Sequence, residues 1–124
     1  MNIMNRSFIF SFCFVVISAF AETFISTDVP VHIPDGPSGI ARSYLTIPVN
    51  REILDINITL TITHTFAGDL RLYLEAPNGD VVRLANRCGF SGINYTNTTF
   101  DDEAGTFICD GNPPFTGSFY PDEP

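Results

Sequence analysis

The sequence contains no lysine, only two histidines and only three cysteines in 124 residues. Six arginines therefore face 14 acidic residues, and the formal net charge is −8. A surface this acidic argues against nucleic acid and anionic membranes as partners, and it is compatible with divalent cations. The sequence also has no zinc-binding histidine pair and no nucleophile elbow. We therefore expect no catalytic residues in this chain.

Long apolar runs are missing except at the N-terminus. Residues 7–20 (SFIFSFCFVVISAF) follow a short polar start, and Ala19 and Ala21 are small residues at the positions that a signal peptidase reads. The run is shorter than the roughly 20 residues that span a bilayer, so we interpret residues 1–21 as a signal peptide cleaved after Ala21. The expected product is secreted or periplasmic and has no membrane association after cleavage. It keeps five arginines and all 14 acidic residues, a formal charge of −9.

Cleavage of a signal peptide would remove Cys13 and leave Cys88 and Cys109. An even pair of cysteines in an exported protein predicts a disulfide. The bond would close a loop of about 20 residues. Because it restricts the unfolded chain, it would stabilise the folded state by about 3 kcal/mol. No CxxC spacing indicates redox chemistry.

Helical periodicity is absent, whereas strand periodicity is strong in the middle of the chain. From Leu54 to Phe66 apolar and polar residues alternate strictly, and a second alternation covers residues 70–76. Residues 77–80 (PNGD) are typical of a hairpin turn, and residues 81–84 are the expected returning strand. These patterns predict antiparallel β-strands with one buried face. His64 lies on the apolar face, and we expect a partly buried imidazole hydrogen-bonded at the rim of the sheet.

The flanking segments give weaker patterns. Residues 22–28 form a short lead-in. Residues 29–34 alternate, but two prolines confine them to a sheet edge, and residues 41–49 predict a further strand. Residues 86–124 are rich in Gly, Asn, Thr, Asp and Pro with single aromatic residues between them, which indicates long loops held down by aromatic side chains.

Acidic residues gather in one of these loops. Asp101, Asp102 and Glu103 are consecutive and lie inside the expected disulfide loop, and Asp69 lies at the turn between the two central alternations. Ca²⁺ takes 6–8 oxygen ligands in loose geometry, and clustered carboxylates on an irregular loop suit it. A solvated acidic turn without a metal is the alternative interpretation, because no EF-hand spacing is present.

Several short motifs occur in a fixed order along the chain. They are residues 33–39 (IPDGPSG), 62–70 (ITHTFAGDL), 74–79 (LEAPNG), 97–104 (NTTFDDEA) and 114–121 (PFTGSFYP). Together they resemble the P domain, also called the P/Homo B domain, of subtilisin/kexin-like proprotein convertases and bacterial secreted proteases. The central motifs match best, with "ItHty-GDL" followed by "L-sP-G" as the family pattern.

This resemblance implies a jelly-roll-like antiparallel β-sandwich over residues 29–124 without catalytic residues of its own. In the family the domain packs against a protease domain, stabilises it and influences its calcium dependence. The resemblance implies Ca²⁺ as a cofactor, with Asp69, Asp101, Asp102 and Glu103 as the ligands.

The sequence departs from the family pattern at both ends. In the family a protease domain precedes the module and the last strands carry a "G-W-L-v-D"-like pattern, and we expect neither here, because an expected signal peptide leads almost directly into the module and the sequence has no tryptophan. We therefore expect a C-terminally truncated sandwich with an open sheet edge that invites another chain. The alternative is a free-standing, calcium-dependent binding module for carbohydrate or surface protein.

Overall fold

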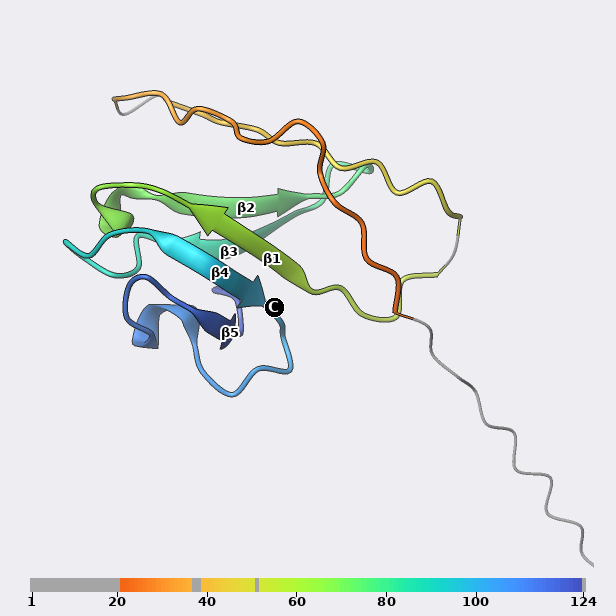
Figure 1. Cartoon of the computed structure of the whole chain (residues 1–124). Coiled ribbons are helices and arrows are strands. Elements are labelled where there is room, and N and C mark those ends of the chain that lie inside the picture. The colour runs from red at the N-terminus through yellow and green to blue at the C-terminus, as the bar shows by residue number, and fades with distance from the viewer. Residues whose placement is uncertain (1–20, 37–38, 51, 124) are drawn as a thin grey trace, which may run out of the picture. The chain divides into compact units, whose positions relative to one another are not determined.

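The computed structural model describes residues 21–36, 39–50 and 52–123, and Figure 1 shows the chain. It separates into two compact units, residues 1–50 and residues 51–124. The predicted signal peptide lies almost entirely outside the described residues, so its cleavage stays a prediction. None of the described residues belongs to a helix that is long and apolar enough to cross a membrane.

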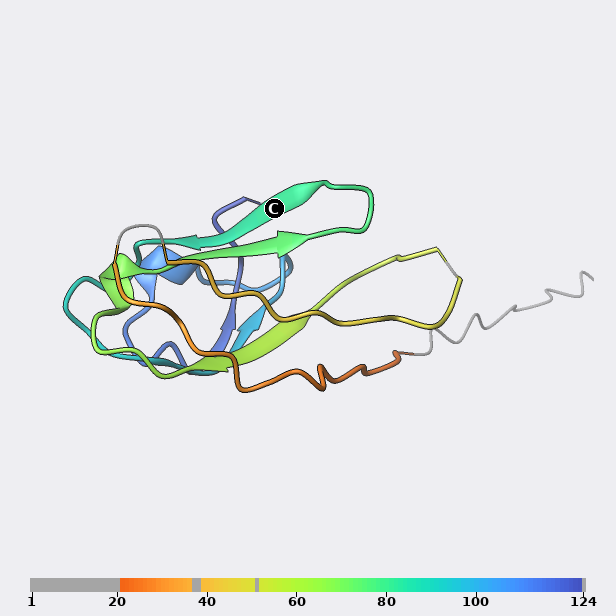
Figure 2. The same ribbon diagram turned by 90° about the horizontal axis from the view of Figure 1, so that it is seen from above.

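The described residues of the second unit, 52–123, contain five strands and two 3₁₀ turns. In chain order they are β1 (Ile58–Ile62), η1 (Ala67–Asp69), β2 (Arg71–Glu75), β3 (Val81–Asn86), β4 (Tyr95–Phe100), η2 (Ile108–Asp110) and β5 (Gly117–Phe119). The strands form a three-stranded sheet in the order β1-β4-β5 and a two-stranded sheet of β2 and β3. Figure 2 shows the two sheets as separate layers. The expected all-β sandwich is confirmed.

The β2–β3 hairpin follows the sequence closely. Leu72 and Leu74 are half-buried and alternate with exposed polar residues, as the period of two requires. The predicted turn is present, because the N–H of Gly79 donates to the carbonyl of Ala76 at 2.9 Å. Gly79 has a φ of +91°, a backbone conformation that glycine adopts without a steric penalty.

The longest predicted strand is shorter in the structure than its alternating pattern. Of residues 54–66, only Ile58–Ile62 form β1, and β1 pairs antiparallel with β4 rather than with β2. The two central alternations therefore belong to different sheets. The strand β5 adds to β4 in parallel, so the larger sheet is mixed rather than wholly antiparallel. Hydrophobic alternation shows which face of a strand is buried, but it carries no information about which strand lies beside it.

The C-terminal third contains two strands where the composition indicated only loops. β4 has the sequence YTNTTF, and its buried side chains are Tyr95, Thr98 and Phe100 rather than alternate residues. Asn97 has a φ of +47°, which interrupts the period of two within this strand. The expectation that aromatic residues hold this region down is correct, since Tyr95, Phe100 and Phe115 are among the largest fully buried side chains.

The core of the second unit lies around these aromatic rings. Tyr95 stacks on Phe115 with ring centroids 4.6 Å apart, and Phe119 meets Phe115 edge-on at 6.2 Å. Such aromatic pairs contribute about 0.5–1.5 kcal/mol beyond the area that they bury. The hydroxyl of buried Thr98 donates to the carbonyl of Phe115 at 2.8 Å, which satisfies a polar group inside the core.

The first unit contains no strand among its described residues, 21–36 and 39–50, although the sequence predicts strands at residues 29–34 and 41–49. Its organising group is the carboxylate of Asp28. The hydroxyls of Ser26 and Ser43 each donate to one carboxylate oxygen at 2.6 Å, and the backbone N–H of Tyr44 donates to the other at 2.7 Å. These hydrogen bonds lower the pKa of Asp28 to about 2, the side-chain bonds from Ser26 and Ser43 contributing most.

Candidate functional site

The four predicted calcium ligands do not form one site. Asp69 ends η1, which the backbone ties to the loop before β4 through the bond from Gly68 N–H to the Phe90 carbonyl at 2.9 Å. Asp101 follows the opposite end of β4, where Phe100 pairs with Ile58. The six residues of β4 separate these ends by about 16 Å, at roughly 3.3 Å per residue. The β1–β4 pairing therefore places Asp69 apart from the other three residues, which sequence spacing alone did not reveal.

Asp101, Asp102 and Glu103 share one turn after β4. The N–H of Glu103 donates to a carboxylate oxygen of Asp101 at 2.9 Å, and the N–H of Asp101 donates to the carbonyl of Phe119 at 3.0 Å. Asp102 and Glu103 are exposed. Within the described part of the chain, no three His, Cys, Asp or Glu side chains are grouped closely enough to hold a metal ion. Calcium binding at this turn would therefore need backbone carbonyls or water as further ligands.

A pocket of about 260 Å³ opens beside this turn, and we name it the sandwich-end pocket. It lies where β1 begins and β4 ends, and both sheets contribute to it. Its lining residues are Ile53, Leu54, Asp55, Ile56, Ile58, Leu74, Val82, Leu84, Phe100, Asp101, Asp102, Pro121 and Glu123. The inner wall includes the buried side chains of Leu84 and Phe100, and the acidic residues are exposed or half-buried. The pocket therefore combines an apolar interior with an acidic rim.

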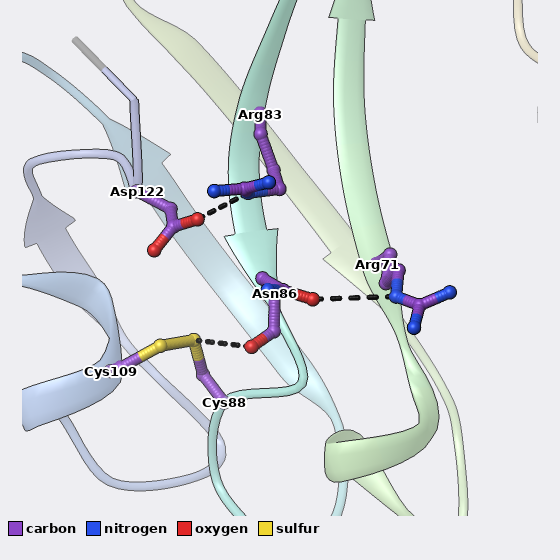
Figure 3. Close-up of a disulfide and its surroundings, with 6 residues drawn as sticks. All are labelled: Arg71, Arg83, Asn86, Cys88, Cys109 and Asp122. Atoms are coloured by element: carbon purple, nitrogen blue, oxygen red, sulfur yellow. Dashed lines mark hydrogen bonds and ion pairs between the residues drawn. A yellow bond between two sulfur atoms is a disulfide. The ribbon is translucent and has the colours of Figure 1, made fainter.

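The C-terminal segment reaches the rim of this pocket by pairing with β3. The N–H groups of Asp122 and Glu123 donate to the carbonyls of Leu84 and Arg83 at 3.1 and 2.9 Å. Arg83 also forms ion pairs with Asp122, which Figure 3 shows, and with Glu123 at 3.0 Å. The hydrogen bond that the Arg83 guanidinium donates to the Asp122 carboxylate raises the pKa of Arg83 further above its ordinary value. The charge of Glu123 is thus partly balanced within the chain.

The predicted disulfide is present between Cys88 and Cys109, 21 positions apart. Figure 3 shows how it links the segment that follows β3 to η2. Cys88 and Ile108 are buried, so the bond lies against the core of the second unit. It fastens the long loop that leads from β4 to β5, and this loop contains the acidic turn.

His64 has the structural role expected of it. Its side chain is half-buried, and its ring Nδ1 lies 3.1 Å from the N atom and 2.9 Å from the O atom of Phe66. Its own backbone N–H donates to the side-chain oxygen of Asn94 at 3.0 Å. The imidazole therefore fastens the turn between β1 and η1 through local backbone contacts.

Sequence reasoning missed the sandwich-end pocket and two of its four acidic residues. Asp55 was interpreted only as part of an alternating strand, and Glu123 only as part of a chain end. The adjacency of Phe100 and Asp101 is the one signal that could have indicated an apolar interior beside an acidic rim. The rest requires the pairing of β3 with residues 122–123, which no local pattern encodes.

Comparison with known proteins finds similarity in the central segment. Residues 53–108 match the model described as "Proprotein convertase P-domain". The chain is also 34% identical over 70 residues to Leupeptin-inactivating enzyme 1 of Streptomyces exfoliatus. That alignment covers 55% of this chain and 16% of the relative, so the chain spans about a sixth of the relative's length. No solved structure matches the chain.

Proposed function

Because residues 53–108 are a P domain of the proprotein convertase type, we propose that the chain is a secreted, non-catalytic module that stabilises a subtilisin-like protease domain. The P-domain match carries this proposal, and it confirms the resemblance seen in the sequence. The matched residues lie within the second unit, which has its own aromatic core and disulfide. A rigid accessory module of this kind acts on proteolysis indirectly, by stabilising the domain that cuts.

The disulfide supports the proposed location. Disulfides form and persist in oxidising compartments, and they are rare in reducing ones. Together with the predicted signal peptide, the Cys88–Cys109 bond favours an exported protein.

The test uses a subtilisin-like convertase catalytic domain from which its own P domain has been deleted. The full chain is added in trans, and the half-life of peptidase activity is measured at a fixed temperature. We expect a longer half-life, because a partner that binds only the native state stabilises it by mass action. Phe115→Ala, which removes a fully buried ring, is the control and should lose the effect. Equal half-lives with and without the chain would contradict the proposal.

We further propose that the turn Asp101–Glu103 binds Ca²⁺. Asp102 and Glu103 are exposed, so their carboxylates are accessible to a cation and to water. Ca²⁺ accepts both carboxylate and water oxygens as ligands. The proposal omits Asp69, because the β1–β4 register separates it from the turn.

Thermal melts with calcium and with EDTA test the calcium proposal. At a calcium concentration ten times the Kd, binding should stabilise the protein by about 1.4 kcal/mol. Glu103→Gln should abolish the increase in Tm, whereas Asp69→Asn should keep it and serves as a control with the same change in charge. An identical Tm in calcium and in EDTA would contradict calcium binding.

A further inference from the structure

The sandwich-end pocket is lined by both apolar and acidic residues, so it is neither a purely apolar cleft nor only a solvated acidic turn. Leu74 and Val82 are half-buried and Leu84 is buried, and all three face the pocket from the two-stranded sheet. Phe100, only 2% exposed, closes it from the three-stranded sheet. An open apolar pocket of this kind gains free energy when an apolar group of a ligand covers it.

Every charged residue among the described residues that line the pocket is acidic. These residues are Asp55, Asp101, Asp102 and Glu123. Arg83 balances Glu123 from outside the pocket. The carboxylate of Asp55 accepts a hydrogen bond from Asn57 at 3.1 Å, and that of Asp101 accepts one from Glu103. Each ionised carboxylate has about four acceptor positions, so both retain the capacity to accept further hydrogen bonds.

A group that suits this pocket must be apolar along its length and positively charged at its end. Arginine has this shape, since its methylene stem covers apolar surface while its guanidinium remains at the polar rim. The guanidinium also offers five N–H donors in a planar fork, which suits several carboxylates spread around an opening better than a compact ammonium does.

We propose that the sandwich-end pocket binds the side chain of an arginine presented by a partner polypeptide. The stem lies against Leu84 and Phe100, and the guanidinium meets Asp55, Asp101 and Asp102. The complementary charges of guanidinium and rim select this occupant over a purely apolar one. The proposal goes beyond the role in protease stabilisation and does not depend on it, because the pocket lies within this chain.

The experiment is a titration of the isotopically labelled full chain in EDTA, followed by methyl and backbone NMR. The probe is the peptide acetyl-Val-Arg-Val-amide, and the matched peptide carries citrulline, which keeps the shape of arginine but lacks its charge. We expect the arginine peptide to shift the methyl resonances of Leu84 and Val82. The citrulline peptide should bind roughly tenfold more weakly, because it loses the charge-assisted hydrogen bonds.

Variants separate this site from the proposed calcium site. Asp55→Asn should weaken binding of the arginine peptide and leave the calcium-dependent change in Tm intact, because Asp55 lies outside the acidic turn. Glu103→Gln should do the reverse. Asp69→Asn, at the other end of β1 and β4, should change neither. The proposal is overturned if both peptides bind equally, if the shifts appear away from the pocket, or if neither peptide binds.

Discussion

The two units of the chain differ in what they do with similar sequence. Both contain alternating stretches rich in β-branched residues, but only residues 52–123 contain strands, while the described residues 21–36 and 39–50 contain none. In the first unit most of the described large apolar side chains are exposed, namely Ile25, Val29, Val31, Ile40, Tyr44, Leu45, Ile47 and Val49, while Phe24 and Ile33 are half-buried. In the second, aromatic rings are fully buried. Alternation of apolar and polar residues is therefore compatible with a β-strand but is not sufficient to form one.

The physical reason is that a strand needs a partner for its backbone and a core for its apolar face. β1 has both, because it pairs with β4 and its isoleucines are half-buried. The first unit has prolines at positions 30, 34 and 48, and each removes an N–H group that a ladder would need. Its described hydrogen bonds centre instead on one exposed carboxylate, that of Asp28.

The largest expected effect is that of Phe115→Ala. Removing this ring deletes the stack on Tyr95 and leaves a cavity, which should cost about 3–5 kcal/mol of unfolding free energy. Urea denaturation followed by circular dichroism measures the loss. Ile47→Ala, at an exposed position of the first unit, should change stability by no more than about 0.5 kcal/mol. A comparable loss at Ile47 would break the contrast between the units.

A smaller loss is expected from removing the disulfide. The Cys88→Ala, Cys109→Ala double variant should lose about 3 kcal/mol, because the unfolded chain regains the freedom of a loop whose ends are 21 positions apart. Urea denaturation again gives the value, and wild-type protein in reductant is the matched control. A double variant as stable as the oxidised wild type would show that the bond does not stabilise the second unit.

Tyr95→Phe, in contrast to the two changes above, should not lower the unfolding free energy. The Tyr95 hydroxyl is buried, and none of the described groups hydrogen-bonds it. Its removal should leave stability unchanged or raise it by about 1 kcal/mol. Burial also raises the pKa of Tyr95 to about 12. The folded state thus disfavours ionisation, and this contribution to stability is present below the ordinary tyrosine pKa near 10 and is lost as pH rises toward 12.

Alkaline unfolding of wild type and Tyr95→Phe tests that dependence, with Tyr73→Phe at an exposed position as the control. The wild type and Tyr73→Phe should lose stability between about pH 10 and pH 12, and Tyr95→Phe should lose less. A Tyr95→Phe variant destabilised at neutral pH would mean that the hydroxyl has a partner.

The smallest effect is expected in the first unit and concerns Asp28. Its pKa of about 2 lies below the ordinary value of 3.8, so the hydrogen bonds of its ionised form contribute above that ordinary value. They are lost as pH falls from about 4 to about 2. An NMR titration of the carboxylate measures the pKa, and Ser43→Ala should raise it because one donor is removed. A pKa of Asp28 at its ordinary value would mean that the first unit lacks these local hydrogen bonds, and the contrast between the two units would be larger.

The sequence predicted local features well and pairings poorly. The β2–β3 hairpin, the disulfide and the local role of His64 were all available from pattern, since each depends on neighbouring residues or on counting. β4 was missed because Asn97, at a φ of +47°, interrupts its alternation. The grouping of Asp69 with Asp101 was wrong, since distance along the chain does not show at which end of a sheet a turn lies.

By itself the sequence determined the β class of this protein, the buried faces of its hairpin and the P-domain match of residues 53–108, because alternation, turn residues and ordered motifs are local. Only the tertiary structure decided that β1 lies beside β4, that Asp69 stands apart from the acidic turn, and that residues 122–123 close on β3. Those outcomes follow from which apolar faces meet in the core and which strand edges find hydrogen-bond partners, and both depend on residues far apart in the chain.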